Sequence, residues 1–201
     1  SPTTVAIYFG EPEVTVKDPY FDGKGPGRTG CRHCGACMTG CRHNAKNTLD
    51  KNYLHLAQQL GVTILAENEV TSVKPLGKNG IDGYEISFRQ STKYFSRTQS
   101  VNADGVVFAG GVFGTIPLLL KLKKTTLHGL SNRLGHMIRT NSEALIYVTS
   151  TDKSPELHKG IAIGSILEMD ENSHLEPVRY GKGSGFWRIT MVPMVSGRNV
   201  F

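Results

Sequence analysis

The feature that most constrains the fold is a change of hydrophobic period near residue 105. Residues 84–89 alternate strictly between apolar and polar side chains, and residues 69–74 and 93–101 also have the composition of strands. Such alternation indicates antiparallel strands with one buried face. Residues 105–109 (G-V-V-F-A) are instead apolar on both faces, as in a buried parallel strand. The order predicts an antiparallel meander of about three strands, followed by one strand of a parallel sheet.

Two helices are predicted on either side of this meander. Apolar residues recur at helical spacing between Leu49 and Leu60, and Gly61 follows as a stop signal. The second helix is expected at residues 115–124, with Pro117 in its first turn. Shorter apolar runs predict further strands at residues 4–9, 62–67, 144–150, 161–168 and 186–192. The fold class is therefore α/β, and α+β in part.

The predicted parallel strand ends in small residues, Ala109, Gly110 and Gly111. Glycine carries no Cβ, so a planar cofactor or a pyrophosphate can lie against such a turn. Nucleotide-binding sheets place turns of this kind at the carboxyl ends of parallel strands. The alternative is a plain connection from strand to helix, and the glycines alone do not decide between the two.

All four cysteines of the chain lie within eleven residues, at Cys31, Cys34, Cys37 and Cys41. The spacing C-x2-C-x2-C-x3-C is that of bacterial-type ferredoxins, in which thiolates hold an iron–sulfur cluster. Basic side chains around the run would offset the charge of a cluster. Arg42 stands where ferredoxins have proline, however, and a second set of cysteines is absent from the sequence.

Two other interpretations of the cysteines stay open. Four thiolates suit a tetrahedral Zn²⁺ ion, although zinc sites usually take two C-x2-C pairs from separate loops. Free buried thiols or disulfides are the third interpretation, and short crowded loops strain a disulfide.

The chain carries a formal net charge of +6, and its positive residues are mostly scattered. No basic stripe with interleaved aromatics occurs, so nucleic acid is not an expected partner. No apolar run is long enough for a transmembrane segment, and no signal peptide is visible. The sequence starts at Ser1 without an initiator methionine, so an N-terminal part is expected to be missing. The cellular location stays open, with a cytoplasmic or peripheral one favoured.

Several segments together resemble a known family. The run G-C-R-H-C-G-A-C-M-T-G-C-R-H-N-A-K-N-T-L-D-K-N-Y-L at residues 30–54 resembles the glucose–methanol–choline (GMC) oxidoreductases, in their bacterial cholesterol oxidase-like branch. Residues 66–73, 103–120 and 131–141 agree with the same family in the same order. The resemblance covers nearly the whole chain and is most specific over residues 29–141.

The resemblance implies an FAD-binding domain of the two-dinucleotide-binding type with an inserted meander, and hydride transfer from an alcohol to the flavin. Residues 1–142, including the cysteine-rich loop 28–46, would be part of the FAD domain. Residues 143–201 would begin a substrate domain built on a mixed sheet. The expected substrate is a small-molecule alcohol or sterol, and an electron-acceptor protein is a further expected partner.

Individual positions follow from the same resemblance. Val70 matches the residue whose backbone contacts the adenine of FAD, and Ala109, Gly110 and Gly111 match the turn near its phosphates. Asn141 matches a small polar position near the flavin. Thr190 stands where some cholesterol oxidases carry an acidic base for steroid isomerisation. The family's N-terminal G-x-G-x-x-G and its C-terminal catalytic histidine segment are absent from this sequence, so no catalytic residue is predicted here.

An alternative function of another class is a small iron–sulfur or metal-binding module for electron transfer. A cluster beside a flavin would pass electrons to an external acceptor, making a dehydrogenase rather than an oxidase. A third interpretation is a globular α/β domain without any cofactor.

Overall fold

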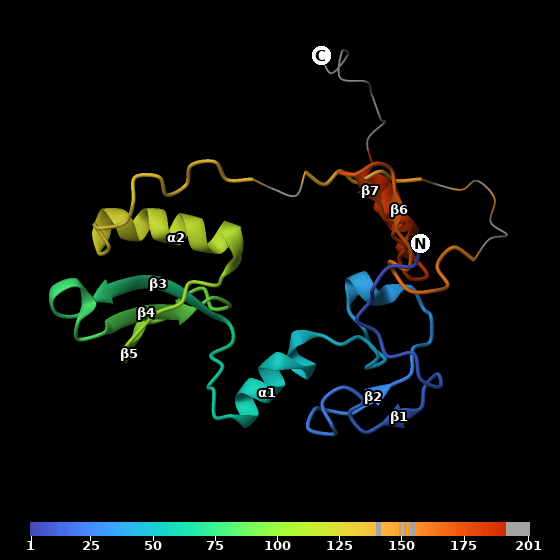
Figure 1. Ribbon diagram of the computed structural model, residues 1–201, viewed down its shortest axis with the longest axis horizontal. Helices are drawn as coiled ribbons and strands as arrows, with labels where there is room; N and C mark the ends of the chain where they lie inside the picture. Colours follow the sequence, from blue (N-terminus) through green and yellow to red (C-terminus); the bar gives the residue numbers. More distant parts are fainter. Residues whose placement is uncertain (140–141, 149, 151, 153–155, 192–201) are drawn as a thin grey trace, which may run out of the picture. The chain divides into compact units, whose positions relative to one another are not determined.

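The computed structural model of the protein describes residues 1–139, 142–148, 150, 152 and 156–191 (Figure 1). The chain forms two compact units. The first, here called the cysteine unit, combines Ser1–Thr63 with Leu145–Phe201. The second, the meander unit, is Ile64–Ala144. Helices and strands are both present, as expected for an α/β fragment.

A three-stranded antiparallel sheet is the centre of the meander unit. β3 (Asn68–Pro75) pairs with β4 (Tyr84–Gln90), and β4 pairs with β5 (Gln99–Ala103). The turn between β3 and β4 contains the short 3₁₀ helix η3 (Lys78–Gly80). The predicted meander is confirmed, but its last strand begins at residue 99 rather than 93, because residues 93–98 find no partner on β4.

Helix α2 (Gly111–Thr125) packs against this sheet, as Figure 1 shows. Val73 of β3 and Leu122 of α2 are almost completely buried, which removes apolar surface from water on both elements. The prediction for this helix was wrong at its start, because the helix begins four residues earlier. Pro117 therefore lies in the helix interior, where its ring removes one backbone hydrogen bond.

Residues 105–109 do not form the predicted buried strand. The structure assigns them no ladder, and Val107 is 89% exposed. A strand needs a neighbour for its backbone N–H and C=O groups, and among the described residues nothing pairs with this segment. The prediction of a buried parallel strand at residues 105–109 is therefore wrong for the described structure.

The cysteine unit consists mostly of loops. Its strands are two-residue pairs, β1 (Thr15–Val16) with β2 (Arg28–Thr29) and β6 (Leu167–Glu168) with β7 (His174–Leu175). Its helices are short: η1 (Ala36–Thr39), η2 (Leu49–Lys51), α1 (Tyr53–Gln59) and η4 (Ser184–Thr190). The helix predicted between Leu49 and Leu60 is confirmed with a break at Asn52, where the backbone is not helical.

Several strands predicted outside the meander are wrong. Residues 4–9 and 62–67 form no strand, and residues 161–168 are reduced to β6. Single bridges such as Ile7 to Lys46 replace ladders, since the chain turns away after one pair. Residues 186–190 belong to the 3₁₀ helix η4 rather than to a strand, and the described part of 144–150 has no ladder. The mixed sheet of a substrate domain therefore stays a prediction, and so does the division at residue 142.

Candidate functional site

The start of α2 is the first candidate site, and the sheet fixes its position. The Lys121 ammonium donates to the carbonyl of Thr71 at 2.9 Å, and the Thr126 hydroxyl donates to the carbonyl of Val73 at 2.6 Å. Together with the buried Leu122, these contacts hold the helix along β3. These contacts lie in the second half of α2 and at its C-cap, ten residues or more beyond Gly111, and they fix the helix that carries the candidate site.

The first turn of α2 is open and carries no acidic side chain. Gly110 is its N-cap and makes no side-chain cap, and the Gly110 N–H is bound to the Thr115 hydroxyl at 3.1 Å. Gly111 has a φ of 72°, a conformation that favours glycine, and a Cβ built there would meet open space. The N-terminus of a helix of 15 residues carries a partial positive charge and free N–H groups. This turn suits an anion such as a phosphate.

Val70 lies near the start of β3, opposite Phe88 of β4, and is 39% exposed. The β3–β4 register is irregular between Val70 and Ser72, which marks a local bulge. Figure 1 shows that β3 and α2 start at the same end of the meander unit. An exposed apolar side chain and an open helix start thus occur at one end of one unit.

The other two positions predicted to contact FAD are less informative. Ala109 is exposed and lies in the segment without regular structure just before α2. Asn141 lies outside the described residues. The roles of Val70, Ala109, Gly110, Gly111 and Asn141 in cofactor binding stay predictions.

The four cysteines form the second candidate site, in the cysteine unit. Cys31, Cys34, Cys37 and Cys41 all line one cavity of about 20 Å³. None of them is in a disulfide, and Cys31 is buried while the other three are partly exposed. The four residues predicted as metal ligands thus line one cavity together with six other residues. A space of this size holds about one water molecule.

The thiols differ in their electrostatic surroundings. Burial raises the pKa of the Cys31 thiol, although its sulfur accepts the His33 N–H at 3.3 Å. Burial also acts to raise the pKa of Cys41, but backbone N–H groups of Lys46, Ala45 and His43 outweigh it, and the pKa is lowered. Within the described part of the chain, no three His, Cys, Asp or Glu side chains are placed to hold a metal ion. The cysteines as metal ligands therefore stay a prediction without structural support.

Sequence reasoning missed the buried arginine at the base of the cysteine loop. Arg28 is fully buried, and its guanidinium donates to Asn47 Oδ1 at 2.8 Å and to the Lys51 carbonyl at 2.6 Å. Its Nε finds no acceptor among the described residues. Arg28 thus joins the chain before the cysteines to the chain after them. Its position directly before the cysteine run was the one available signal.

Asp18 is the second buried charge that the sequence did not reveal. Its carboxylate accepts N–H groups of Tyr20, Phe21 and Gly25 at 3.1, 2.8 and 2.9 Å. Burial acts to raise its pKa, but these hydrogen bonds and the charge of Arg28 outweigh burial, so the pKa of Asp18 is lowered. The carboxylate fixes the turn that leads into β2.

Thr190 is not on a strand, contrary to the expectation for the isomerase position. It lies in η4, and its hydroxyl donates to the Trp187 carbonyl at 2.7 Å. No helix among the described residues has the length and apolar character needed to cross a membrane.

Comparison with known proteins identifies the family. Residues 27–128 match the family model described as GMC oxidoreductase. This segment is half of the chain and includes the four cysteines, the meander and the start of α2. The chain belongs to the GMC oxidoreductase family. The resemblance found in the sequence is thereby confirmed.

The relatives agree with the cholesterol oxidase-like branch. The chain is 41% identical over 206 residues to a cholesterol oxidase of Acinetobacter baumannii, covering 98% of this chain and 37% of the relative. It is 41% identical over 205 residues to cholesterol oxidases of two Mycobacterium tuberculosis strains, covering 98% of this chain and 35% of each relative. The chain therefore spans little more than a third of these relatives. No solved structure matches it.

Proposed function

We propose that the chain is the central part of an FAD-dependent oxidoreductase that oxidises the CH–OH group of an alcohol or sterol. The observation that carries this proposal is the 41% identity to cholesterol oxidases across 98% of the chain. The open start of α2 supports it, because a phosphate of FAD finds N–H groups and no acid there.

The chain's own contribution to this reaction is binding. The turn at Gly110 and Gly111 and the free N–H groups of the first turn of α2 would hold the FAD phosphates, and the backbone of Val70 would contact the adenine. Bound FAD supplies the acceptor for the hydride that leaves the alcohol carbon. Residues 1–142 would belong to the FAD domain, and residues 143–201 would begin the substrate domain. We place no catalytic acid or base in this chain, and no isomerisation step.

The iron–sulfur alternative gains no support. The relatives are named as cholesterol oxidases, and within the described residues no three His, Cys, Asp or Glu side chains are placed to hold a metal ion. A flavoenzyme without a cluster in this loop is the simpler interpretation.

The test is a spectrum of the full-length protein that contains this chain. We expect flavin absorption, and loss of that absorption when cholesterol is added without oxygen. A cholesteryl ester, which lacks the free hydroxyl, is the matched control and should leave the spectrum unchanged. A protein without flavin, or a flavin that no alcohol reduces, would overturn the proposal. Product analysis in the same experiment should give the unisomerised ketone.

A further inference from the structure

The cysteine loop, residues 31–41, carries chemistry that the proposed reaction does not use. Its four free thiols line one cavity of about 20 Å³, roughly the space that one water molecule needs. A thiol can be oxidised reversibly when a second thiol lies within reach, because the two can form a disulfide. Four thiols around so small a space are therefore a candidate redox site.

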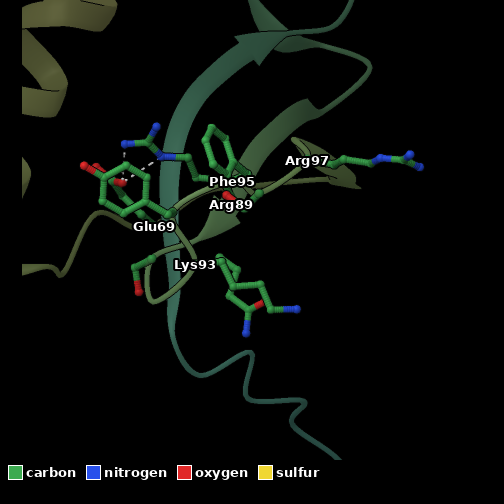
Figure 2. A pocket seen from close by; sticks show the side chains of 9 residues that line it. Glu69, Arg89, Lys93, Phe95 and Arg97 are labelled. Carbon is green, nitrogen blue, oxygen red and sulfur yellow. Dashed lines mark hydrogen bonds and ion pairs between the residues drawn. The ribbon is translucent and has the colours of Figure 1, made fainter.

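The larger groove of the meander unit offers no such chemistry. It has a volume of about 500 Å³ and lies at the connection between β4 and β5, where Figure 2 shows its side chains. Arg89 and Glu69 pair with each other there, with nitrogen–oxygen distances of 3.0 and 2.9 Å. No cysteine or histidine is among the described residues that line this groove. The cysteine loop is the stronger candidate for a reactive site.

Hydrogen bonds fix the segment between Cys31 and Cys37 at both of its ends. The Cys31 N–H donates to the Tyr8 carbonyl at 3.1 Å. The Lys46 ammonium donates to the Cys37 carbonyl at 3.1 Å. These contacts restrict the two cysteines before any bond forms between them, so that less freedom is lost when their sulfurs react.

The middle of this segment is attached to a later part of the chain. The Gly35 N–H donates to the Gly160 carbonyl at 2.7 Å, and the Gly160 N–H donates to the His33 carbonyl at 2.6 Å. Gly35 has a φ of 70°, and a Cβ built there would collide with the His158 carbonyl oxygen. The segment thus holds Gly160 through a close backbone contact that requires glycine.

Among the other three thiols, Cys37 is the best partner for Cys31. Burial raises the pKa of the Cys31 thiol, and the charge of Cys37 raises it more than the charges of Cys34 and Cys41 do. Charge effects weaken with distance, which favours Cys37 as the nearest of the three. Cys31 is buried and Cys37 is partly exposed, so a small oxidant meets Cys37 first.

We propose that Cys31 and Cys37 form a reversible disulfide when the protein meets hydrogen peroxide, and that this bond tightens the segment that holds Gly160. The Cys37 sulfur attacks one peroxide oxygen, so that an S–O bond forms, the O–O bond breaks, and hydroxide leaves and takes up the thiol proton. The Cys31 sulfur then attacks the sulfenic acid on Cys37, and water leaves as the S–S bond forms. Two thiols thus give up two electrons and two protons, and the peroxide becomes two water molecules.

The test is treatment of the full-length holoprotein with hydrogen peroxide, without an alcohol substrate, followed by blocking of free thiols, digestion with trypsin and mass spectrometry. Trypsin cleaves after Arg28, Arg32 and Arg42, so Cys31 and Cys37 lie on different peptides. We expect residues 29–32 joined to residues 33–42 by a bond that dithiothreitol breaks. Hydrogen exchange around Gly160 should slow by at least about tenfold on oxidation, because the crosslink restricts the loop.

The remaining two cysteines offer matched controls. Cys34→Ser and Cys41→Ser make the same change in the same loop and should keep the joined peptides, whereas Cys37→Ser should lose them. Oxidised protein without joined peptides, or joined peptides that persist in Cys37→Ser, would overturn the proposal. Exchange around Gly160 that is equal before and after oxidation overturns it as well. The wild-type digest decides even where a variant fails to fold. The inference does not rest on the proposed enzymatic function, because it concerns the thiols alone.

Discussion

Backbone hydrogen bonds between strands hold the meander unit together, whereas buried charged side chains hold the loops of the cysteine unit. β3, β4 and β5 satisfy one another's N–H and C=O groups, and apolar Val73 and Leu122 fill the space under α2. The cysteine unit has only two-residue ladders, and Arg28 and Asp18 organise its loops through hydrogen bonds. The two units should therefore respond to different substitutions, and each prediction below addresses one of them.

The largest effect is expected at Arg28. Arg28→Ala leaves Asn47 Oδ1 and the Lys51 carbonyl without their donor and removes a buried charge next to Asp18. We expect a loss of local stability on the order of 4 kcal/mol. Hydrogen exchange measured by mass spectrometry should rise across residues 28–52 and stay unchanged in the meander.

Arg32→Ala is the control for this substitution. The Arg32 side chain is 47% exposed and pairs with an exposed Glu13 at 3.1 Å, so its loss should cost less than about 1 kcal/mol. Equal exchange in the two variants would show that Arg28 does not organise the cysteine loop.

The apolar counterpart in the meander unit is Leu122. Leu122 has no exposed surface, and Leu122→Ala should cost about 3 kcal/mol because it leaves a cavity between α2 and β3. Leu120→Ala on the same helix removes a side chain that is 39% exposed and should cost about 1 kcal/mol or less. In Leu122→Ala, hydrogen exchange should rise in α2 and β3 but not in the loop that carries the cysteines. A Leu122 variant as protected as the Leu120 variant would contradict the packing described here.

A smaller effect, dependent on pH, is expected at Asp18. Its pKa is lower in the folded protein than in the unfolded chain, so its contribution to stability is present above the ordinary Asp pKa of about 4 and is lost as the pH falls through the folded value. The melting temperature should fall less on acidification in Asp18→Asn than in the wild type. Asp22→Asn, which changes an exposed carboxyl in the same loop, should follow the wild type. If the melting temperature of Asp18→Asn falls with decreasing pH as steeply as that of the wild type, protonation of Asp18 does not affect the stability of the fold.

The same contrast explains how much the sequence could predict. The alternation in residues 84–89 predicted β4 and the meander, because the period of side chains follows directly from strand geometry. Arg28 and Asp18 could not be identified as buried, since charged residues in a Pro- and Gly-rich stretch are typical of exposed loops. The cysteine spacing left an iron–sulfur cluster, a zinc ion, and free thiols or disulfides open, and the four cysteines are free thiols in the structure. Residues 105–109 have the apolar pattern of a buried strand but pair with no described segment.

For the candidate FAD site the sequence predicted the residues, and the structure adds the geometry of the helix start. The family resemblance selected Gly110 and Gly111, but the extra turn of α2 from residue 111 was not predicted. Pro117 led to the later start, because proline is commonest in a first turn. The open first turn without an acid is therefore a structural finding. A negative charge placed there tests whether the start of α2 binds the FAD phosphates.

The most direct test is the FAD affinity of the full-length protein with Gly110→Asp. Asp is a favourable N-cap residue, and a Cβ at Gly110 makes only an ordinary contact of 3.5 Å with the Thr115 hydroxyl. Folding should therefore be preserved, while the new carboxylate repels the phosphates and weakens FAD binding by about tenfold or more. Gly105→Asp adds the same charge where a Cβ meets open space and should change the affinity far less. An unchanged FAD affinity in the folded Gly110→Asp protein would contradict the assignment of the α2 start to FAD.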